Sequence, residues 1–378
     1  MKTRLVIAYG VFLIGVLVSS YCFVDPNLQY LQWFYLHFSL RSQPGKIALL
    51  LIILVIFFTF YILILRLYQR KILKQKDGIR LITMTVLCLL FSYPAVYSYD
   101  IFNYVATAKV AFLYGENPYI VMPIEFTGEP ILSFMHAPNK VALYGPGWII
   151  LTLLPFIVGG GNFVLTLFSF KAFIIVFYCL LLYLLYKLSK NFFAVLFFGL
   201  NPLVVIETII GGHNDVVMMA FLFIGIYLYL RKNRSFGVIF YICSVITKYA
   251  TLILLPVFLL LKYTHRREII TQTQLLRWSM YGMIIIFLMS SFREEIYPWY
   301  AIWFLPFVAL VGSRNEKLLA IVFTFCLELR YFPYMIFLTH FGITPLLKTI
   351  ITFVPLIVLV VLLFINRVWG KTSLHYLR

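Results

Sequence analysis

Uninterrupted apolar runs of about 20 residues recur along this chain, and they limit what it can fold into. Residues 47–65, for example, contain no charged side chain. A helix needs about 20 such residues to cross the hydrocarbon core of a bilayer, whereas a membrane β-strand alternates apolar and polar residues. The composition agrees, because 63% of the residues are hydrophobic and 12% are charged, against about 25% charged in soluble domains. The sequence therefore predicts an all-α polytopic membrane protein.

The apolar runs predict about ten transmembrane helices within one domain, residues 1–378. Two stretches do not fit as ordinary spans. Trp148–Val158 is short and bounded by glycines, so we expect it to be re-entrant or to lie along the outer face. Phe236–Lys262 is long, and we expect two half-helices that meet near Lys248, because broken helices at membrane depth pack in protein or line a cavity. The predicted spans are 5–24, 46–65, 81–99, 163–186, 191–210, 216–230, 276–292, 300–313, 318–338 and 346–366.

Basic residues concentrate in the loops on one side of these spans. With both termini placed in the cytoplasm, the cytoplasmic loops hold 22 of the 31 Lys and Arg residues. This asymmetry follows the positive-inside rule, so the net charge of +18 requires no nucleic-acid partner. The five cysteines are scattered and indicate neither a disulfide framework nor a zinc site. We expect a multi-pass protein of the cell (plasma) membrane whose longest loop, residues 100–146, faces outward.

That loop begins with Asp100, and the following stretch Ile101–Tyr114 has the apolar spacing of a helix. Such a helix can lie in the membrane interface with its aromatic side chains at headgroup level. Asp100 is then suited to two compatible roles. It can cap the helix, since Asp is a favoured N-cap residue, or it can deprotonate an acceptor hydroxyl at the membrane–water boundary.

Ionisable residues within spans are costly and are therefore functional or paired by default. Lys248 either extends its stem to the interface or binds a phosphate. Glu207, His213 and Asp215 lie close together in the sequence. Asp215 can cap the next helix and His213 can bond to a backbone carbonyl; alternatively, the group recognises sugar hydroxyls or orients Asp100. A metal pair there would lack a third ligand.

Further ionisable residues have structural explanations open to them. Lys171 needs a partner such as Glu207, or it helps to hold an anionic lipid. Arg330 and Glu328 are expected to pair with other helices. The aromatic stretch 297–300 reads equally well as an anchor in the membrane interface and as a platform for a sugar ring.

Several short motifs follow one another in a fixed order over roughly residues 95–310. This succession resembles that of polytopic glycosyltransferases of the GT-C class, and in particular the polyprenyl-phosphate-mannose-dependent mannosyltransferases. The chain departs from their pattern at Asn103 and Lys109, where such enzymes often carry arginine and glycine-arginine. The resemblance therefore bears on the class of enzyme more than on the donor. The motifs are Asp100, Gly115-Glu-Asn-Pro-Tyr119, Tyr144-Gly-Pro146, Asn201-Pro202, Glu207, Gly212-His-Asn-Asp215, Lys248-Tyr249, Leu255-Pro256, Tyr297-Pro-Trp-Tyr300 and Pro306.

The resemblance implies an inverting transfer of a hexose, most of all mannose, from a polyprenyl-phosphate sugar to a lipid-linked or cell-envelope glycan on the extracytoplasmic face. A lipid-phosphate leaving group does not demand a metal, so no cofactor is expected. By position, Asp100 becomes the catalytic base, and Lys248 and Arg293 bind the donor phosphate. Sugar and acceptor contacts are expected from Asn117, Tyr119, Tyr144, Glu207, His213, Asn214, Asp215, Trp299 and Tyr300.

Two other functions also fit a polytopic chain with charges at membrane depth. A transporter or flippase for lipids or lipid-linked sugars would use broken helices and midplane charges in the same way. It predicts inverted repeats between the two halves, and none is evident in the sequence. A non-catalytic assembly protein would leave Asp100, Asp215 and Lys248 separately replaceable without loss of function.

Overall fold

The computed structural model describes residues 2–264, 271–293 and 295–373, and it describes side chains for 2–260, 271–292 and 295–367. These residues form helices and no strand. Within them, six helices are long and apolar enough to cross a membrane, and a bent pair, Phe192–Gly199 with Pro202–Ile210, makes a seventh. The prediction of an all-α polytopic membrane protein is therefore confirmed. The six are α1 (Lys2–Ser20, continuing to Phe23), α3 (Gln43–Gln69), α7 (Phe163–Ser189), α13 (Gln272–Arg293), α15 with α16 (Arg314–Leu329 and Tyr331–Phe337) and α17 (Thr344–Ser373).

The remaining elements are shorter, and several of them correspond to predicted spans. The predicted span 216–230 is α10, and 300–313 is covered by η9 and α14; both are apolar but below 18 residues. The shorter elements are α2 (Gln32–Phe38), α4 (Gln75–Leu89), α5 (Asp100–Ala108), α6 (Pro146–Gly159), α8 (Phe192–Gly199), α9 (Pro202–Val204), α10 (Asp215–Leu230), α11 (Arg234–Thr247), α12 (Leu255–Thr264) and α14 (Leu305–Val311), the π-helical segments η3 (Lys109–Leu113) and η6 (Val205–Ile210), and the 3-10 segments η1 (Tyr21–Phe23), η2 (Gln29–Leu31), η4 (Pro123–Glu125), η5 (Pro130–Ser133), η7 (Tyr249–Leu254) and η9 (Pro298–Trp303).

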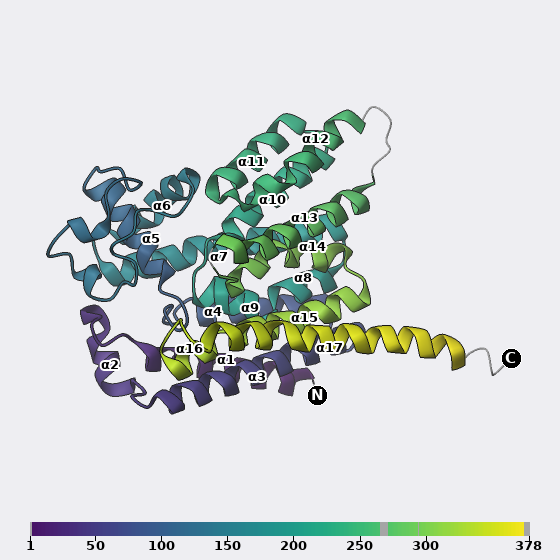
Figure 1. The fold of residues 1–378 in the computed structure, drawn as a ribbon, viewed down its shortest axis with the longest axis horizontal. Helices are drawn as coiled ribbons and strands as arrows, with labels where there is room; N and C mark the ends of the chain where they lie inside the picture. Colours follow the sequence, from purple (N-terminus) through teal and green to yellow (C-terminus); the bar gives the residue numbers. More distant parts are fainter. Residues whose placement is uncertain (1, 265–270, 294, 374–378) are drawn as a thin grey trace.

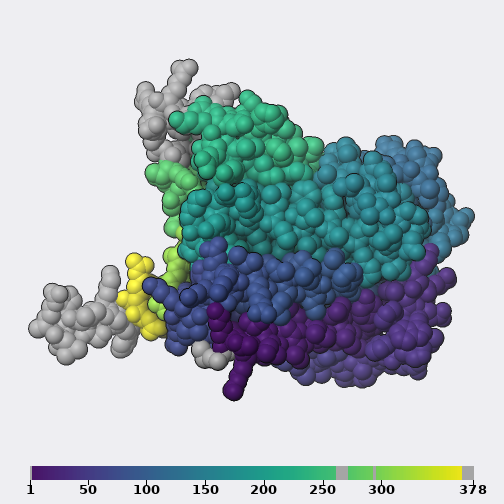
Figure 2. All heavy atoms as spheres, turned by 180° about the vertical axis from the view of Figure 1, so that it is seen from behind, coloured from purple at the N-terminus to yellow at the C-terminus, as the bar shows by residue number. Residues whose placement is uncertain are grey.

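α15 and α17 run along the long axis of the molecule, α10, α11 and α12 are inclined to it, and the loop-rich part lies at one end (Figure 1). That end holds α2, α5 and α6, while the N-terminus and the last described turns of α17 lie toward the other. In the space-filling view the N-terminal helices (purple) form one side, and the middle of the chain (teal) packs on them (Figure 2). The outer-loop prediction therefore corresponds to a distinct layer at one end of the bundle.

The predicted span 81–99 is wrong in its second half, because α4 ends at Leu89. The fully buried Lys171 on α7 donates to the carbonyls of Leu89 and Ser92 and to the Ser92 hydroxyl. Terminal helix carbonyls need such partners when they are buried, and Pro94 could not continue the helix without losing a hydrogen bond. Lys171 thus satisfies the end of α4 and does not pair with Glu207.

The predicted span 191–210 is not straight. It bends by 60° between α8 and the segment that begins at Pro202. The Asn201 side chain accepts from the Leu203 amide and caps the second segment, and proline is well placed at the first position of a helix. The second segment continues into η6, which carries Glu207.

The long stretch 236–262 breaks where the sequence predicted. α11 ends at Thr247, Lys248 is extended with φ −157° and ψ 126°, and η7 follows. α11 packs closely on α10, because a Cβ at Gly225 would lie 2.9 Å from the Gly237 carbonyl oxygen. This close contact fixes the start of α10, with Asp215, relative to the break at Lys248.

Candidate active site at the start of α5

Asp100 is the first residue of α5, and Tyr99 occupies the N-cap position without a capping side-chain bond. The expected capping role of Asp100 is therefore wrong. Its carboxylate turns instead to two side chains: Asn103 Nδ2 lies 3.5 Å from Oδ1, and His213 Nδ1 lies 3.5 Å from Oδ2. The side chain keeps 29% of its surface exposed. Asp100 is thus held from within the protein and open on one side.

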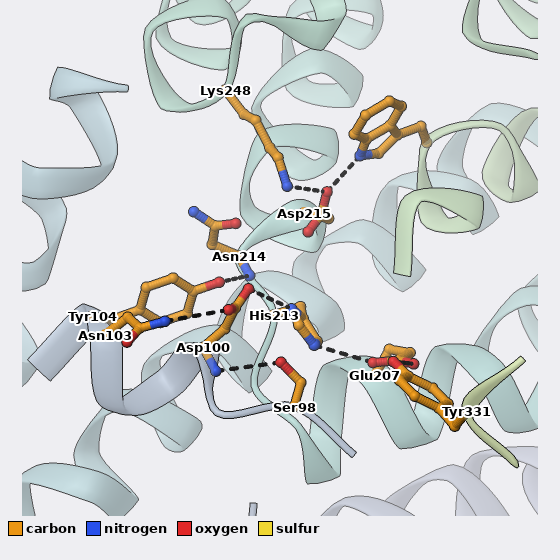
Figure 3. A network of polar contacts seen from close by, with 11 residues as sticks. Ser98, Asp100, Asn103, Tyr104, Glu207, His213, Asn214, Asp215, Lys248 and Tyr331 are labelled. Carbon is orange, nitrogen blue, oxygen red and sulfur yellow. Dashed lines mark hydrogen bonds and ion pairs between the residues drawn. The ribbon is translucent and has the colours of Figure 1, made fainter. Parts of the chain in front are cut away.

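His213 lies between two carboxylates (Figure 3). Its Nε2 is 3.1 Å from Glu207 Oε2, while Nδ1 faces Asp100. Both distances are those of ion pairs, but neither ring nitrogen has a hydrogen bond with good geometry to a described residue. The ring is fully buried and stacks on Trp299, with centroids 4.0 Å apart. The alternative in which His213 bonds to a backbone carbonyl is therefore not what the structure shows.

The two carboxylates make His213 a cation at neutral pH. Burial alone would lower the pKa of His213, but Asp100 and Glu207 outweigh it and raise the pKa to about 9. Burial likewise would raise the pKa of the Asp100 carboxyl, yet His213, Lys248 and Asn103 together hold it below its usual value. Asp100 is accordingly ionised across the neutral range.

Glu207 is fixed from its other side by a residue that the sequence did not single out. Glu207 lies in the π-helical segment η6, and Tyr331 at the start of α16 donates to its Oε1 at 2.8 Å. Tyr331 stacks on Tyr97, with centroids 4.5 Å apart. Tyr331 is 124 residues from Glu207, so only tertiary packing reveals this partner.

A second ion pair lies next to the first. Asp215 is the first residue of α10, after Asn214 at the N-cap, so the expected cap at Asp215 is also wrong. Its carboxylate accepts from Lys248 Nζ at 2.8 Å and from the Trp303 indole. Lys248 also lies over the ring of Tyr300, 4.7 Å from the centroid. Asp215 is fully buried, whereas Lys248 retains 23% exposure, so Lys248 is the reachable member of the pair.

Tyr104, which the sequence did not single out, and the predicted loop residues surround this cluster at different depths. Tyr104 receives the Asn214 amide on its hydroxyl at 3.4 Å and meets Tyr144 edge to face. Tyr119 donates to the Tyr144 carbonyl at 2.8 Å. Asn117 is exposed and its side chain accepts from the Tyr119 amide, which shapes the Asn-Pro-Tyr turn. Tyr144 therefore borders the site, while Asn117 and Tyr119 support the loop that carries it.

Two other predicted charges, Arg330 and Glu328, make no hydrogen bond with the described residues of the cluster. Arg330 pairs with Glu295 at 3.1 Å and bonds to Thr352 on α17, as a cross-helix structural role predicts. The Glu328 carboxylate is buried with no hydrogen-bond partner among the described residues. The side chain of Arg293 lies outside the described residues. Within the part of the chain that is described, His, Cys, Asp and Glu form no group of three that could hold a metal ion.

The fold and the site together define a class: a helical membrane protein with a partly exposed carboxylate, supported by a buried histidine, beside a lysine–aspartate pair. The family model described as alpha-(1->6)-mannopyranosyltransferase, N-terminal domain (MptA_B family), matches residues 1–264. The chain belongs to this family, and the resemblance to mannosyltransferases seen in the sequence is confirmed. No curated protein and no solved structure gives a significant match. The chain is thus a membrane glycosyltransferase that transfers mannose.

Proposed function

We propose that this chain is a GT-C-type mannosyltransferase that takes mannose from a polyprenyl-phosphate donor. The acceptor is a lipid-linked or cell-envelope glycan, and the reaction takes place on the extracytoplasmic face of the cell membrane. The observation that carries the proposal is the placement of Asp100, partly exposed at the loop-rich end and held by the buried His213. Family membership supports the mannosyl transfer, and the polyprenyl-phosphate donor is proposed from the resemblance of the motif order.

In the proposed reaction Asp100 acts as general base. The acceptor hydroxyl oxygen bonds to C1 of mannose while the bond from C1 to the phosphate oxygen breaks, and the phosphate leaves with the electron pair. Asp100 takes the proton of the acceptor hydroxyl. A positioned base of this kind contributes about 10²–10⁴-fold to the rate.

The exposure of each remaining side chain indicates whether it can contact the substrate or only position another residue. Lys248 can reach a substrate, and its ammonium would stabilise the negative charge that grows on the departing phosphate. Three side chains are buried and ion-paired: His213 with Glu207, and Asp215 with Lys248. Their burial favours a role in orienting Asp100 and Lys248 over direct contact with the sugar. Trp299 stacks on both His213 and Tyr297, so it supports the histidine. Tyr144 and Tyr300 remain the candidates for sugar contact.

Lys248→Ala should therefore affect the donor more than the chemical step. Loss of the ammonium removes a charge that the donor phosphate meets on binding, while Asp100 keeps His213 and Asn103 as partners. We expect the KM for the donor to rise at least tenfold with a smaller change in kcat. Steady-state kinetics over a donor series measure both, and an unchanged donor KM would remove Lys248 from the donor site.

The decisive experiment uses the purified chain in lipid nanodiscs with radiolabelled polyprenyl-phosphate mannose and a lipid and glycan extract. In Asp100→Asn the rate of label transfer should fall by about 10²-fold or more, because the amide cannot accept the proton. Glu116→Gln is the matched control, since Glu116 is an exposed carboxylate of the same loop, and it should transfer label at the wild-type rate. Normal turnover in Asp100→Asn would refute the assigned base. Movement of labelled donor between leaflets without product would favour a flippase.

A further inference from the structure

A large cavity lies at the end of the molecule opposite Asp100. It is open on one side, has a volume of about 1280 Å³ and is lined by the end of α3, the start of α4, α8, the start of α15 and one residue of α17. α15 begins at this cavity, and Tyr331, just past its other end, contacts Glu207. At 1.5 Å per residue, the length of α15 separates the two places by about 24 Å. The cavity is therefore distinct from the candidate active site.

The cavity concentrates positive charge. Among the described residues that line it, five are Lys or Arg and none is Asp or Glu. They come from separate segments: Arg66 from α3, Lys71 and Lys74 from the link to α4, and Arg314 and Lys317 from α15. The ion pairs found among the described residues do not include these five cations. Glu316 interacts electrostatically with Lys317 from the same helix, but no carboxylate of the described residues lines the cavity itself. Clustered like charges repel one another and favour a bound counter-ion.

The positive-inside rule explains why cations occupy this end of the bundle, but it does not explain their convergence on a cavity. Orientation rules act on loops and are satisfied by cations at any exposed position. Here the cations come from chain segments about 250 residues apart, and packing of α3 against α8 and α15 brings them to one concave surface. The arrangement is that of a binding site for an anion.

The other half of the cavity wall is apolar. Ile62 and Leu65 on α3, Ile321 on α15 and Leu363 on α17 line it together with Phe193 and Phe197 on α8. A free phosphate or other small anion would occupy the cationic part and leave this wall against water. An amphiphile satisfies both parts, because its headgroup meets the cations and its chain lies along the helices.

We propose that this cavity binds the phosphate headgroup of an anionic phospholipid, with an acyl chain along the wall formed by α3, α15 and α17. Basic cavities between membrane helices at the cytoplasmic side are suited to anionic headgroups, and the positive-inside prediction places this end there. The inference is independent of the proposed reaction, since it uses none of the residues around Asp100.

Native mass spectrometry of the full chain in detergent tests the proposal with three probes: short-chain phosphatidylglycerol, short-chain phosphatidylcholine and inorganic phosphate. We expect saturable binding of phosphatidylglycerol, at least tenfold tighter than of either other probe. The triple variant Arg66→Gln, Lys74→Gln, Arg314→Gln should bind phosphatidylglycerol at least tenfold more weakly. The charge-keeping triple variant Arg66→Lys, Lys74→Arg, Arg314→Lys should retain binding, which separates charge loss from misfolding.

The matched control removes three cations from the same end but outside the cavity, by Lys187→Gln, Arg231→Gln and Lys232→Gln, and should leave binding unchanged. Equal weakening in the cavity and control triples would overturn the proposal, because it would mean general attraction to a basic surface. Ile321→Trp fills space along the apolar wall and should weaken the binding of phosphatidylglycerol without altering the binding of phosphate. Inorganic phosphate binding as tightly as the lipid, or no effect of Ile321→Trp, would overturn the lipid assignment.

Discussion

His213 is fully buried, yet carboxylates face both of its ring nitrogens. An isolated buried imidazolium would lose its proton, because desolvation disfavours the charged form. Asp100 and Glu207 reverse that preference and raise the pKa of His213 to about 9. The proton on His213 in turn keeps Asp100 ionised, so the two groups stabilise each other's charged forms. This coupling would allow the proposed base, Asp100, to be controlled by a buried residue.

The pH dependence follows from these shifts. The pKa of the Asp100 carboxyl is below its usual value of 3.8, so its contribution to stability is present above that value and lost as pH falls through the lowered pKa. The raised pKa of His213 has the opposite sign: its contribution is complete below 6.5 and is lost as pH rises through about 9. We expect mannosyl transfer and thermal stability both to decline as the pH passes about 9.

His213→Gln should shift the acid side of the transfer profile to higher pH, because the cation that lowers the pKa of Asp100 is gone. It should also remove the decline near pH 9 and lower kcat by at least tenfold at pH 7. Measurement of kcat against pH in nanodiscs checks all of this. His340→Gln is the control, since His340 is exposed and stacks only on Tyr334 among the described rings. An acid limb at the wild-type position would show that His213 does not control Asp100.

At the scale of the elements, breaks within helices and close packing between helices position the site residues. Glu207 lies in the segment that follows the bend of 60° after α8, and the break after α11 leaves Lys248 just before η7. Asp215 at the start of α10 lies near Lys248 at the end of α11 because these two helices approach closely at Gly225 and Gly237. Helix backbones come together in this way only where residues are small. The Lys248–Asp215 pair therefore depends on packing well below it.

Gly225→Ala should separate α10 from α11 and displace Lys248 from Asp215. The added Cβ would lie 2.9 Å from the Gly237 carbonyl oxygen and 3.1 Å from the Tyr241 amide nitrogen, both of them backbone atoms. Overpacking of this kind costs about 1–3 kcal/mol, and we expect a lower midpoint of thermal unfolding together with weaker donor binding. Gly15→Ala is the matched control, because nothing lies within 4 Å of a Cβ there. Equal stability of the two variants would contradict this account.

At the scale of the whole molecule, the polar site and the basic cavity lie at opposite ends of one bundle. The loop-rich end carries Asp100 and the opposite end carries the cationic lining. The positive-inside asymmetry predicts that the cationic end faces the cytoplasm. The proposed reaction then uses a donor whose mannose is presented on the outer face.

Cysteine labelling tests this orientation. In a background where the five native cysteines are replaced by serine, Glu116→Cys in the loop should react with a membrane-impermeant maleimide on intact cells. Gln75→Cys, at the first residue of α4, should react only after the membrane is permeabilised. Both positions are exposed, so a difference in labelling reports the side of the membrane. The reverse pattern would place the candidate active site in the cytoplasm and contradict the proposed donor side.

Much of the architecture could be read from the sequence, because partitioning into lipid is decided locally. A run such as 47–65 must form a helix whose backbone bonds are satisfied internally, whatever it packs against. The break at Lys248 was also predicted, since a 27-residue stretch could not cross once without placing basic residues outside. Ends were less predictable: α4 stops at Leu89 because Lys171, 82 residues away in sequence, bonds to its last carbonyl.

The candidate site was likewise predictable only in part. Asp100, Glu207, His213, Asp215 and Lys248 could be selected from the sequence because ionisable groups near lipid are costly and need a reason. Their pairing could not, since Tyr331 and Trp303 reach Glu207 and Asp215 from elements 124 and 88 residues away. Composition and the length of the apolar runs decide which segments form membrane helices. Only the packing of bent and broken helices decides which buried charges meet, because that depends on distances between segments that no local pattern encodes.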